Sequence, residues 1–419
     1  MSARVHVRIL GCLSIALVAM ATPRAAWSQG CVRPVGVGPG IGGQGSGPVV
    51  GSQGSAYLLE GRWQASLGYR WLRSHRHFVG TTEQYRRRAL QNEVVNNTKL
   101  FDVATTYAFT DQFNLTLDVP VVFNRRSSGS QITGARTEVE SEGIGDLTLV
   151  GRWWLQDVKD AHDGNISLGL GFKLPTGDEG ATDTLPNRTP AARPVDQSIQ
   201  PGDGGFGILL DFSMFKSLDD ASSPATVACS HGADGSLAKL CPNPGCAPGS
   251  SRPEHVAKTF YASGTYLINP RNTNGVQTFR GFNAAGVRTS TPGDASFYEQ
   301  VMSVADSYVA RAGFTFTNVT KHPKLTLGIG LRLEGVPVED LIGDSDGFRR
   351  PGHTTSLEPS LIYSLGPDET FSLAVPVAMQ RNRAQSLADQ RASEVAGVRR
   401  HGDAAFADFY VLAGYTRRF

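Results

Sequence analysis

The sequence has 419 residues and a formal net charge of only +2, which excludes a strongly basic nucleic-acid-binding surface and a long acidic tail. Hydrophobic residues make up 40% of the chain, enough for two or three soluble domains or for one large barrel. Glycine is frequent, with 48 residues, although no collagen-like period accounts for it.

The N-terminal segment has the features of a secretory signal peptide. Arg4 and Arg8 precede an apolar stretch from 9 to 21, and small residues follow as far as Ser28. We therefore expect residues 1–28 to direct the chain out of the cytoplasm. Further along, no run of about 18 apolar residues occurs, so a helical membrane anchor is not expected. An exported chain of this kind is either soluble or a barrel of an outer membrane.

The next segment, residues 29–57, is rich in glycine and has no periodic pattern. Such a composition is typical of a flexible linker, which here would be a periplasmic leader. A second interpretation stays open, in which this segment enters a barrel and plugs its lumen.

From residue 58 onward, stretches of about ten residues alternate between apolar and polar side chains. In the stretch 62–71, every odd position is apolar, and every even position is polar or glycine. Ten residues is the length that a tilted strand needs to cross a bilayer, whereas strands of soluble proteins usually have five or six. The predicted strands are 62–71, 100–109, 113–124, 145–155, 165–174, 205–215, 259–269, 307–317, 324–335, 356–365, 371–380 and 408–419.

The two faces of these stretches differ in charge. The apolar face carries one charged residue, Arg417, although 19% of the whole chain is charged. A charge that faces lipid at mid-membrane costs about 2–4 kcal/mol, so a lipid-facing row is expected to lack charges. The opposite face carries charges of both signs, which a sealed core would not tolerate but a hydrated lumen would. The predicted lumen residues are Arg62, Arg70, Asp102, Asp118, Asp146, Arg152, Lys173, Asp211, Arg311, Arg332, Glu334, Glu358 and Asp408.

The connections alternate between short and long, as the periplasmic turns and external loops of outer-membrane barrels do. The long polar connections are about 75–95, 125–142, 175–203, 270–303, 336–355 and 381–403. The sequence thus predicts an all-β fold, a transmembrane antiparallel up-and-down β-barrel of about 12 strands over residues 58–419, with both termini in the periplasm. A soluble antiparallel sandwich would explain the alternation of one strand, but not the strand lengths together with the export signal.

One segment, 217–255, stands where a short periplasmic turn is expected. It contains three cysteines in a compartment where disulfides persist, and a fourth cysteine lies in the glycine-rich segment. The disulfide candidates are Cys31, Cys229, Cys241 and Cys246, and their connectivity stays open. The alternative is a metal site that includes His231, but the cysteine spacing matches no zinc pattern well. We expect no metal and no other cofactor.

Two prolines occupy lumen positions in two similar stretches. Pro120 lies in 113–124 and Pro376 lies in 371–380, and a proline removes one ladder hydrogen bond from a sheet. They are either irregularities of two hairpins or strand kinks that open a side gate to lipid.

The order of three short motifs resembles a known family. Gly145-Asp146-Leu147 opens one predicted strand, Leu174-Pro175-Thr176-Gly177 ends the next, and Gln-Pro-Gly-Asp-Gly-Gly follows at 200–205. Together they resemble the outer-membrane family named after the MetA pathway of phenol degradation, over about residues 60–419. The resemblance implies a barrel that passes hydrophobic or aromatic compounds, and it brings no catalytic residues. The cysteine-bearing segment 217–255 departs from the family's pattern.

The predicted function is passive transport of small hydrophobic or aromatic molecules across a bacterial outer membrane, through a narrow charged lumen or a lateral gate. The expected partners are outer-membrane lipid, a small hydrophobic solute and, through the C-terminal Phe419, the outer-membrane assembly machinery, but no nucleic acid. The alternative is a closed structural barrel whose loops or cysteine-bearing segment bind a partner. An enzyme at the external rim, built from Ser74 with His75 or His401 with Asp403, is the least favoured hypothesis.

Overall fold

The computed structural model describes residues 57–129, 135–161, 163–186, 188–218, 256–319 and 324–419, together with the backbone of residues 27–29. The predicted signal peptide and glycine-rich segment therefore lie outside the described residues, except for residues 27–29 and Tyr57. The cysteine-bearing segment lies outside them from residue 219 to 255, and so do all four disulfide candidates, Cys31, Cys229, Cys241 and Cys246.

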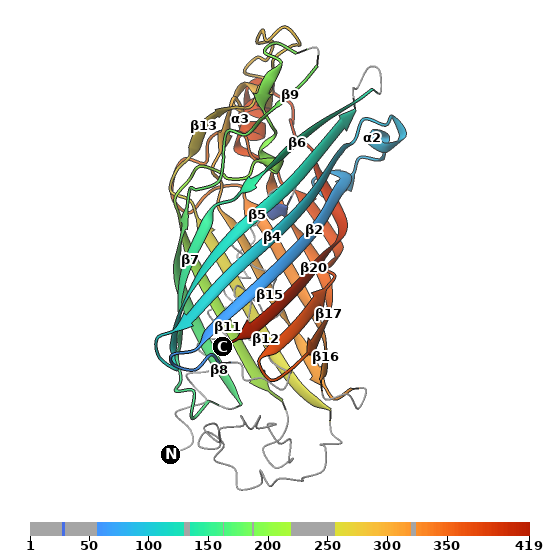
Figure 1. The fold of residues 1–419 in the computed structure, drawn as a ribbon. Coiled ribbons are helices and arrows are strands. Elements are labelled where there is room, and N and C mark those ends of the chain that lie inside the picture. Colours follow the sequence, from blue (N-terminus) through green and yellow to red (C-terminus); the bar gives the residue numbers. More distant parts are fainter. Residues whose placement is uncertain are drawn as a thin grey trace.

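Twelve transmembrane strands form a closed antiparallel barrel, which confirms the predicted fold (Figure 1). Ten of them are single strands: β2 (Trp63–Val79), β4 (Val94–Ala108), β5 (Phe113–Gly129), β8 (Gly164–Leu174), β11 (Gly207–Ser217), β12 (Ala257–Ile268), β15 (Ser307–Thr317), β16 (Leu325–Pro337), β17 (Pro351–Ser364) and β20 (Ala404–Arg418). Successive strands are neighbours in the wall, as in an up-and-down barrel.

Each of the other two transmembrane strands consists of two segments. β6 (Arg136–Ile144) and β7 (Leu147–Trp154) both pair with β5, one above the other. β18 (Glu369–Ala374) and β19 (Val377–Arg383) both pair with β17, and the break between them falls at Val375 and Pro376. The stretch 371–380, predicted as one strand, is therefore interrupted at its proline, because proline cannot donate to the ladder.

The last strand closes the barrel against the first. β20 pairs with β2 from Gln64 and Arg418 at one end to Phe78 and Ala404 at the other. Beyond this ladder, the backbone of Phe419 exchanges two hydrogen bonds with that of Trp63, of 2.9 and 3.3 Å. The C-terminal residue thus belongs to the seam, whereas its role in assembly stays a prediction.

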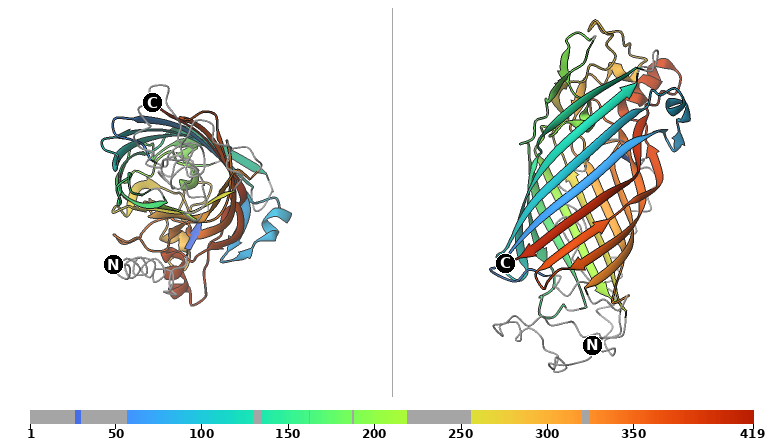
Figure 2. Two further views of the ribbon diagram at one scale, coloured as in Figure 1. Left: turned by 90° about the horizontal axis from the view of Figure 1, so that it is seen from below. Right: turned by 45° about the vertical axis from the view of Figure 1, so that its right-hand side comes forward.

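Apart from the connection between β11 and β12, short connections lie at the end of the barrel where the C-terminus is found, and long ones lie at the opposite end (Figures 1 and 2). Following the predicted orientation, we call these ends periplasmic and extracellular. The long connections contain several short elements: β3 (Thr82–Glu83), α2 (Tyr85–Ala89), β9 (Thr182–Thr184), β10 (Ala192–Pro194), η1 (Gln197–Ile199), β13 (Thr273–Gln277), η3 (Ala295–Phe297), β14 (Val301–Ser303) and α3 (Leu387–Ala396). The three-residue strand β1 (Trp27–Gln29) pairs with β16 and β17 near this end.

The strands are longer than predicted on the extracellular side. The sequence predicts a loop over 125–142, but β5 continues to Gly129 and β6 begins at Arg136. The prediction is wrong there because the outward positions of this extension are polar and charged, Arg125 and Glu140 among them, so no apolar row marks the strand. Its ladder continues beyond the apolar part of the wall, where water replaces lipid.

The barrel is apolar outside and polar inside. Among its most completely buried large side chains are those of Arg332, Lys173, Glu334 and Glu358, whereas large apolar side chains are exposed along the outer face. The exposed apolar side chains include Leu67, Phe101, Val103, Leu117, Leu149, Leu168, Leu170, Leu210, Phe314, Ile329, Leu331, Leu357 and Phe371. An outer surface of this kind is the one that lipid covers, which places the protein in the bacterial outer membrane. Among the described residues, no helix is long and apolar enough to cross a membrane.

Tyr57, at the end of the glycine-rich segment, contacts the inner wall at the periplasmic end. Its ring lies 4.9 Å from that of Trp154 on β7 and 5.9 Å from that of Phe215 on β11, and its hydroxyl donates to the carbonyl of Ala161 at 2.8 Å. Two of these contacts come from strands that are not neighbours of β2, and the third comes from the connection between β7 and β8; β2 begins six residues after Tyr57. The chain therefore crosses the periplasmic opening of the barrel before it enters the wall.

A charge on the outer face tests whether lipid covers it. We predict that Ile329→Arg, at the middle of the outward row of β16, lowers the free energy of unfolding by about 2–4 kcal/mol. The matched control is Val287→Arg, at an exposed apolar position in an extracellular loop, with an expected change below about 0.5 kcal/mol. Urea unfolding in phospholipid vesicles measures both, and equal losses in the two variants would contradict a lipid-covered wall.

Candidate functional site

Most of the predicted lumen residues face the bore. Their side chains are buried or nearly so: Arg70, Asp102, Asp118, Asp146, Arg152, Lys173, Asp211, Arg311, Arg332, Glu334 and Glu358. Arg62 does not line the bore, because it precedes β2 at the periplasmic rim, where it is 38% exposed and pairs with Asp368 at 3.0 Å. Asp408 lies near the top of β20, in an irregular part of the wall described below.

Five of these residues form an ion-pair cluster that we call the lumen network: Arg70, Arg311, Arg332, Glu334 and Glu358. Glu358 on β17 accepts from Arg311 Nε at 2.8 Å and lies 3.4 Å from Arg332. Glu334 accepts from Arg332 Nε at 3.0 Å and lies 3.6 Å from Arg70. Because three transmembrane strands separate β2 from β16 around the wall, the contact from Arg70 to Glu334 crosses the bore.

Two tyrosines extend the lumen network. The guanidinium of Arg70 lies 4.6 Å from the ring centre of Tyr410, and that of Arg311 lies 5.7 Å from the ring centre of Tyr261. Both rings are buried on inward positions of β20 and β12. They were not among the predicted lumen residues, because only charged residues marked the inward rows. Their inward register in an alternating strand was the signal that could have found them.

A second, smaller cluster lies on the opposite part of the wall. Arg152 on β7 donates from Nε to Asp211 on β11 at 2.6 Å, and Thr265 on β12 donates to the same carboxylate at 2.9 Å. β8 lies between β7 and β11, and its residue facing this ion pair is Gly169. A Cβ there would lie 2.9 Å from the Cβ of Asp211, so glycine leaves the room that the ion pair occupies.

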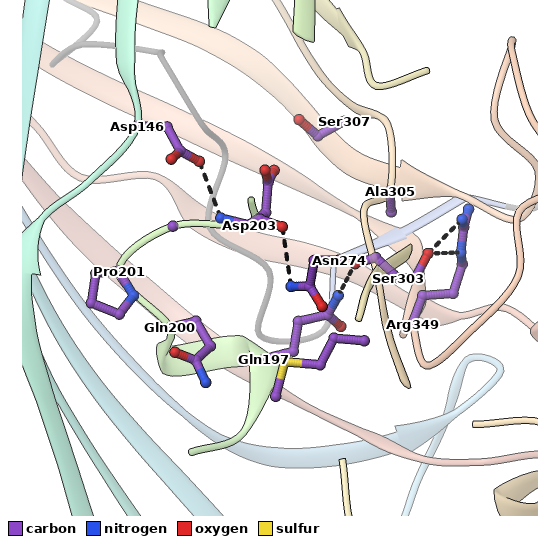
Figure 3. A pocket seen from close by; sticks show the side chains of 12 residues that line it. Asp146, Gln197, Gln200, Pro201, Asp203, Asn274, Ser303, Ala305, Ser307 and Arg349 are labelled. Carbon is purple, nitrogen blue, oxygen red and sulfur yellow. Dashed lines mark hydrogen bonds between the residues drawn. The ribbon is translucent and has the colours of Figure 1, made fainter. Parts of the chain in front are cut away.

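The three motifs that resemble the phenol-degradation family meet at the extracellular mouth of the lumen (Figure 3). Asp146 accepts from the backbone N–H groups of Gly177 and Asp203 at 3.0 and 3.1 Å. Thr176 accepts from the N–H of Leu147 at 2.9 Å, which joins the first motif to the second. Lys173 contacts both Asp203 and Asp146. These bonds fix both ends of the loop 175–206 at the top of β7 and β8.

A small pocket opens beside this site. Its lining includes Gln200, Asp203, Asn274, Ser303 and Arg349, and Figure 3 shows Asn274 directed at Asp203 and Arg349 directed at Ser303. The space accessible to the centre of a water molecule is about 40 Å³, whereas a cavity known to hold benzene measures about 150 Å³. The pocket therefore has room for a few water molecules and is too small for an aromatic solute.

The long loops are tied to one another and to the wall by buried carboxylates. Asp196 accepts from both terminal nitrogens of Arg350, at 2.8 and 2.7 Å, and lies 3.2 Å from Arg126 on β5. Burial alone would raise the pKa of Asp196, but the charges of these two arginines outweigh it and hold the pKa well below its usual range. Asp196 therefore stays charged and pins the loop 175–206 across the mouth.

Asp306 joins two further loops. It accepts from the backbone N–H groups of Asn269 at 2.6 Å and Leu341 at 2.9 Å, and burial raises its pKa. Arg349 donates to both carboxylate oxygens of the neighbouring Asp340, at 2.8 and 2.6 Å. The extracellular mouth is thus crossed by hydrogen-bonded loops from several sides.

Two described histidines near the rim, His77 and His401, are engaged in contacts other than the arrangement that a hydrolase needs. Asp403 pairs with His77 Nδ1 at 2.9 Å, and His77 Nε2 accepts the backbone N–H of Val94 at 2.8 Å. Both ring nitrogens are thus engaged, and neither is free to activate a serine. Burial would raise the pKa of Asp403, but the hydrogen bond from His77 and the nearby charges lower it to about 2. His401 donates to the carbonyl of Arg383 instead of pairing with Asp403.

The wall is irregular between β19 and β20. These strands are paired at one position, Val377 with Phe409, and above it the described part of β20 pairs only with β2. At the rim β19 pairs instead with the residue that follows β2, where Gly80 and Arg383 exchange two hydrogen bonds of 2.9 and 2.8 Å. We call the stretch between these two points, residues 378–382 and 404–408, the wall gap.

Side chains replace the missing ladder in the wall gap. Arg381 donates from Nε to the carbonyl of Ala407 at 2.9 Å and from a terminal nitrogen to Asp408 at 2.8 Å. Arg76 on β2 donates to the same oxygen of Asp408 at 2.7 Å. On the outside, Met379 lies where the register between β19 and β17 shifts, and it is 56% exposed.

The two prolines differ in their surroundings. Pro376 lies in the break between β18 and β19, directly below the wall gap. Pro120 leaves β5 continuous and faces the other break in the wall, because its carbonyl accepts from the N–H of Gly145 between β6 and β7. Among the described residues, no group of three or more histidine, cysteine, aspartate or glutamate side chains is placed to hold a metal.

No family model and no curated protein matches the sequence. Among solved structures, the fold is similar to the COG4313 outer membrane channel from Pseudomonas putida F1, with 13% identity, a TM-score of 0.45, and coverage of 86% of this chain and 97% of that chain. It is also similar to the Ralstonia pickettii toluene transporter TbuX, with 11% identity, a TM-score of 0.36, and coverage of 91% and 98%.

A third similar structure is the translocator domain of the autotransporter NalP from Neisseria meningitidis, with 11% identity, a TM-score of 0.37, and coverage of 86% and 90%. At these identities and scores the likeness concerns the barrel shape alone, which channels and autotransporter domains share. The resemblance to the phenol-degradation family therefore stays a prediction.

Removal of one carboxylate from the lumen network tests whether the network blocks passage along the barrel axis. We predict that Glu358→Gln raises single-channel conductance in planar bilayers severalfold and shifts it toward anions, because Arg311 and Arg332 lose a shared counter-charge. The matched control is Glu138→Gln on the outer face, where the carboxylate pairs with Arg125 at 3.3 Å, and no change is expected. Unchanged conductance in Glu358→Gln would show that the lumen network does not limit passage along the axis.

Proposed function

We propose that the protein is a passive outer-membrane channel for small hydrophobic or aromatic molecules, and that these leave or enter the lumen sideways through the wall gap. The observation that carries the proposal is the near absence of pairing between β19 and β20. In comparison, β16 and β17 are paired at twelve positions, from Leu325 with Tyr363 to Val336 with Gly352.

The axial route is unfavourable for an apolar solute. Loops held by Asp196, Asp306 and Asp146 cross the extracellular mouth, and the lumen network crosses the bore further down. A barrel of twelve strands is also narrower than the 16-stranded porins with open aqueous channels. A solute without charge or hydrogen-bonding groups would have to separate ion pairs here without forming new contacts to compensate.

The wall gap offers a lower barrier. Its closure depends on one backbone pair, on the hydrogen bond from Arg381 to the carbonyl of Ala407 and on ion pairs of the partly exposed Asp408. Exposed ion pairs of this kind are each worth only about 0–1 kcal/mol. Its outer edge carries the exposed apolar side chains of Val377, Met379 and Phe409. An aromatic solute that passes here leaves contact with apolar side chains for the hydrocarbon of the membrane, in which it is soluble.

A reversible cross-link between β19 and β20 tests this route. In a chain whose Cys31, Cys229, Cys241 and Cys246 are replaced by serine, Val377→Cys and Phe409→Cys introduce an opposed pair at the base of the wall gap. We expect the oxidised protein to lose at least about tenfold in the rate of toluene uptake into proteoliposomes, and reductant to restore it.

The matched control joins an opposed outward pair in the regular wall, through Leu331→Cys and Leu357→Cys, and we expect its oxidation to leave uptake unchanged. Uptake that persists with the wall gap cross-linked would contradict the lateral route. If the uncross-linked protein folds normally and passes no toluene, the channel proposal fails as a whole. That outcome would favour a closed barrel that binds a partner through its loops or its cysteine-bearing segment.

A further inference from the structure

The outer face of β2 and β4 changes from apolar to basic near the extracellular end. On β2 the outward residue after Trp71 is Arg73, and on β4 the outward residue before Phe101 is Lys99. The pairing register places Lys99 opposite Trp71, and Arg73 follows two residues higher. Both basic side chains are exposed. They therefore lie directly above the apolar surface that lipid covers.

The short helix α2 adds two further basic residues at the same end. Figures 1 and 2 show α2 standing out from the wall near the extracellular end of β2. Its exposed residues are Arg86 and Arg88, and the apolar Tyr85 and Leu90 at its ends are 71% and 54% exposed. An exposed helix that combines arginines with an aromatic and an aliphatic side chain is typical of a membrane interface.

These four cations, Arg73, Arg86, Arg88 and Lys99, form what we call the basic patch, and they pair with no carboxylate among the described residues. The nearby carboxylates are occupied by other arginines. Glu83 pairs with Arg76, and Asp403 pairs with Arg87, the one arginine of α2 that turns toward the barrel.

The basic patch has a defined boundary. On the next strands, Arg125 is held by Glu138 at 3.3 Å and by Glu140 at 2.6 Å, so the surface becomes acidic toward β6. On this side of the wall, the uncompensated positive charge of β2, β4 and α2 thus ends at β5, where Arg125 is paired. A uniformly basic rim would only reflect general attraction to the membrane, whereas a bounded patch provides a local site.

We propose that the basic patch binds the phosphate groups of the phosphorylated glycolipid, lipid A, that forms the outer leaflet of this membrane. The phosphates of a membrane lipid lie at the boundary of hydrocarbon and water, at the height where Arg73 and Lys99 follow Trp71 and Phe101. Arginine and lysine are the side chains that bind phosphate, arginine through two parallel hydrogen bonds. The acyl chains would cover the outward aromatic residues below.

The test compares two triple variants of the full chain. Arg73→Ser, Arg88→Ser and Lys99→Ser together remove three cations of the basic patch, whereas Lys159→Ser, Lys216→Ser and Lys324→Ser remove three exposed lysines at the periplasmic end. Native mass spectrometry in detergent measures binding of bisphosphorylated lipid A to each. Since each basic group near a charged membrane surface contributes about fivefold in affinity, we expect roughly a hundredfold loss for the patch variant and less than threefold for the control.

Three further measurements separate the outcomes. The affinity of the unchanged protein for dephosphorylated lipid A should be as low as the affinity of the patch variant for phosphorylated lipid A. Added salt should weaken the binding of phosphorylated lipid A to the unchanged protein and leave the binding of the dephosphorylated lipid unchanged. Inorganic phosphate at millimolar concentration should not compete. Equal losses in the two triple variants, affinity independent of the phosphates, or full competition by free phosphate would each overturn the proposal. If a variant fails to fold, the salt dependence of lipid A binding by the unchanged protein still tests whether the phosphates are bound.

Discussion

The structure depends on one constraint: in hydrocarbon, each backbone N–H and C=O group must find its partner within the protein. A closed ring of antiparallel strands meets this requirement, and the seam between β20 and β2 completes the ring. The wall gap is the place where the ladder is not continued, and it lies at the upper edge of the apolar surface, beside Trp71 and Phe409. There the guanidinium of Arg381 donates a hydrogen bond to the carbonyl of Ala407.

The same constraint explains why the interior is charged. The outer face has to be apolar, so the alternate positions of each strand are left for polar residues, and in a bore this narrow their charges must be paired. The lumen network satisfies this from β2, β15, β16 and β17, and Arg152 with Asp211 satisfies it on the other side. The pairing that stabilises the wall therefore also obstructs the axis. A route through the wall is a consequence of that obstruction as much as of the gap itself.

The alternation of apolar and polar residues was enough to predict the strands, the inward rows and the order of the wall. It failed where the wall leaves the membrane, since the outward positions of β6 no longer differ from the inward ones in polarity. It also assigned Arg62 to the lumen, although that residue precedes the first pair of the ladder. Periodicity places a side chain on a face but does not say how far along the strand the bore extends.

The contacts between distant segments were beyond the reach of the sequence. The three motifs that resemble the family were recognised in the sequence, but only the fold brings Asp146 to the backbone of Gly177 and Asp203. Likewise, Pro376 marked a missing ladder bond, whereas the extent of the wall gap depends on where β20 pairs with the bulged upper part of β2 and no longer with β19. Such outcomes depend on the registers of three strands at once, which no local pattern encodes.

The central claim is that, among the described residues, the ladder between β19 and β20 consists of the single pair Val377 with Phe409. Residue-resolved amide hydrogen exchange of the protein in lipid nanodiscs tests it most directly. The account predicts that alternate amides of β19 above Val377 and of β20 above Phe409 exchange within minutes, while amides of β16 and β17 at the same height stay protected for days. Uniform protection around the whole barrel would contradict it.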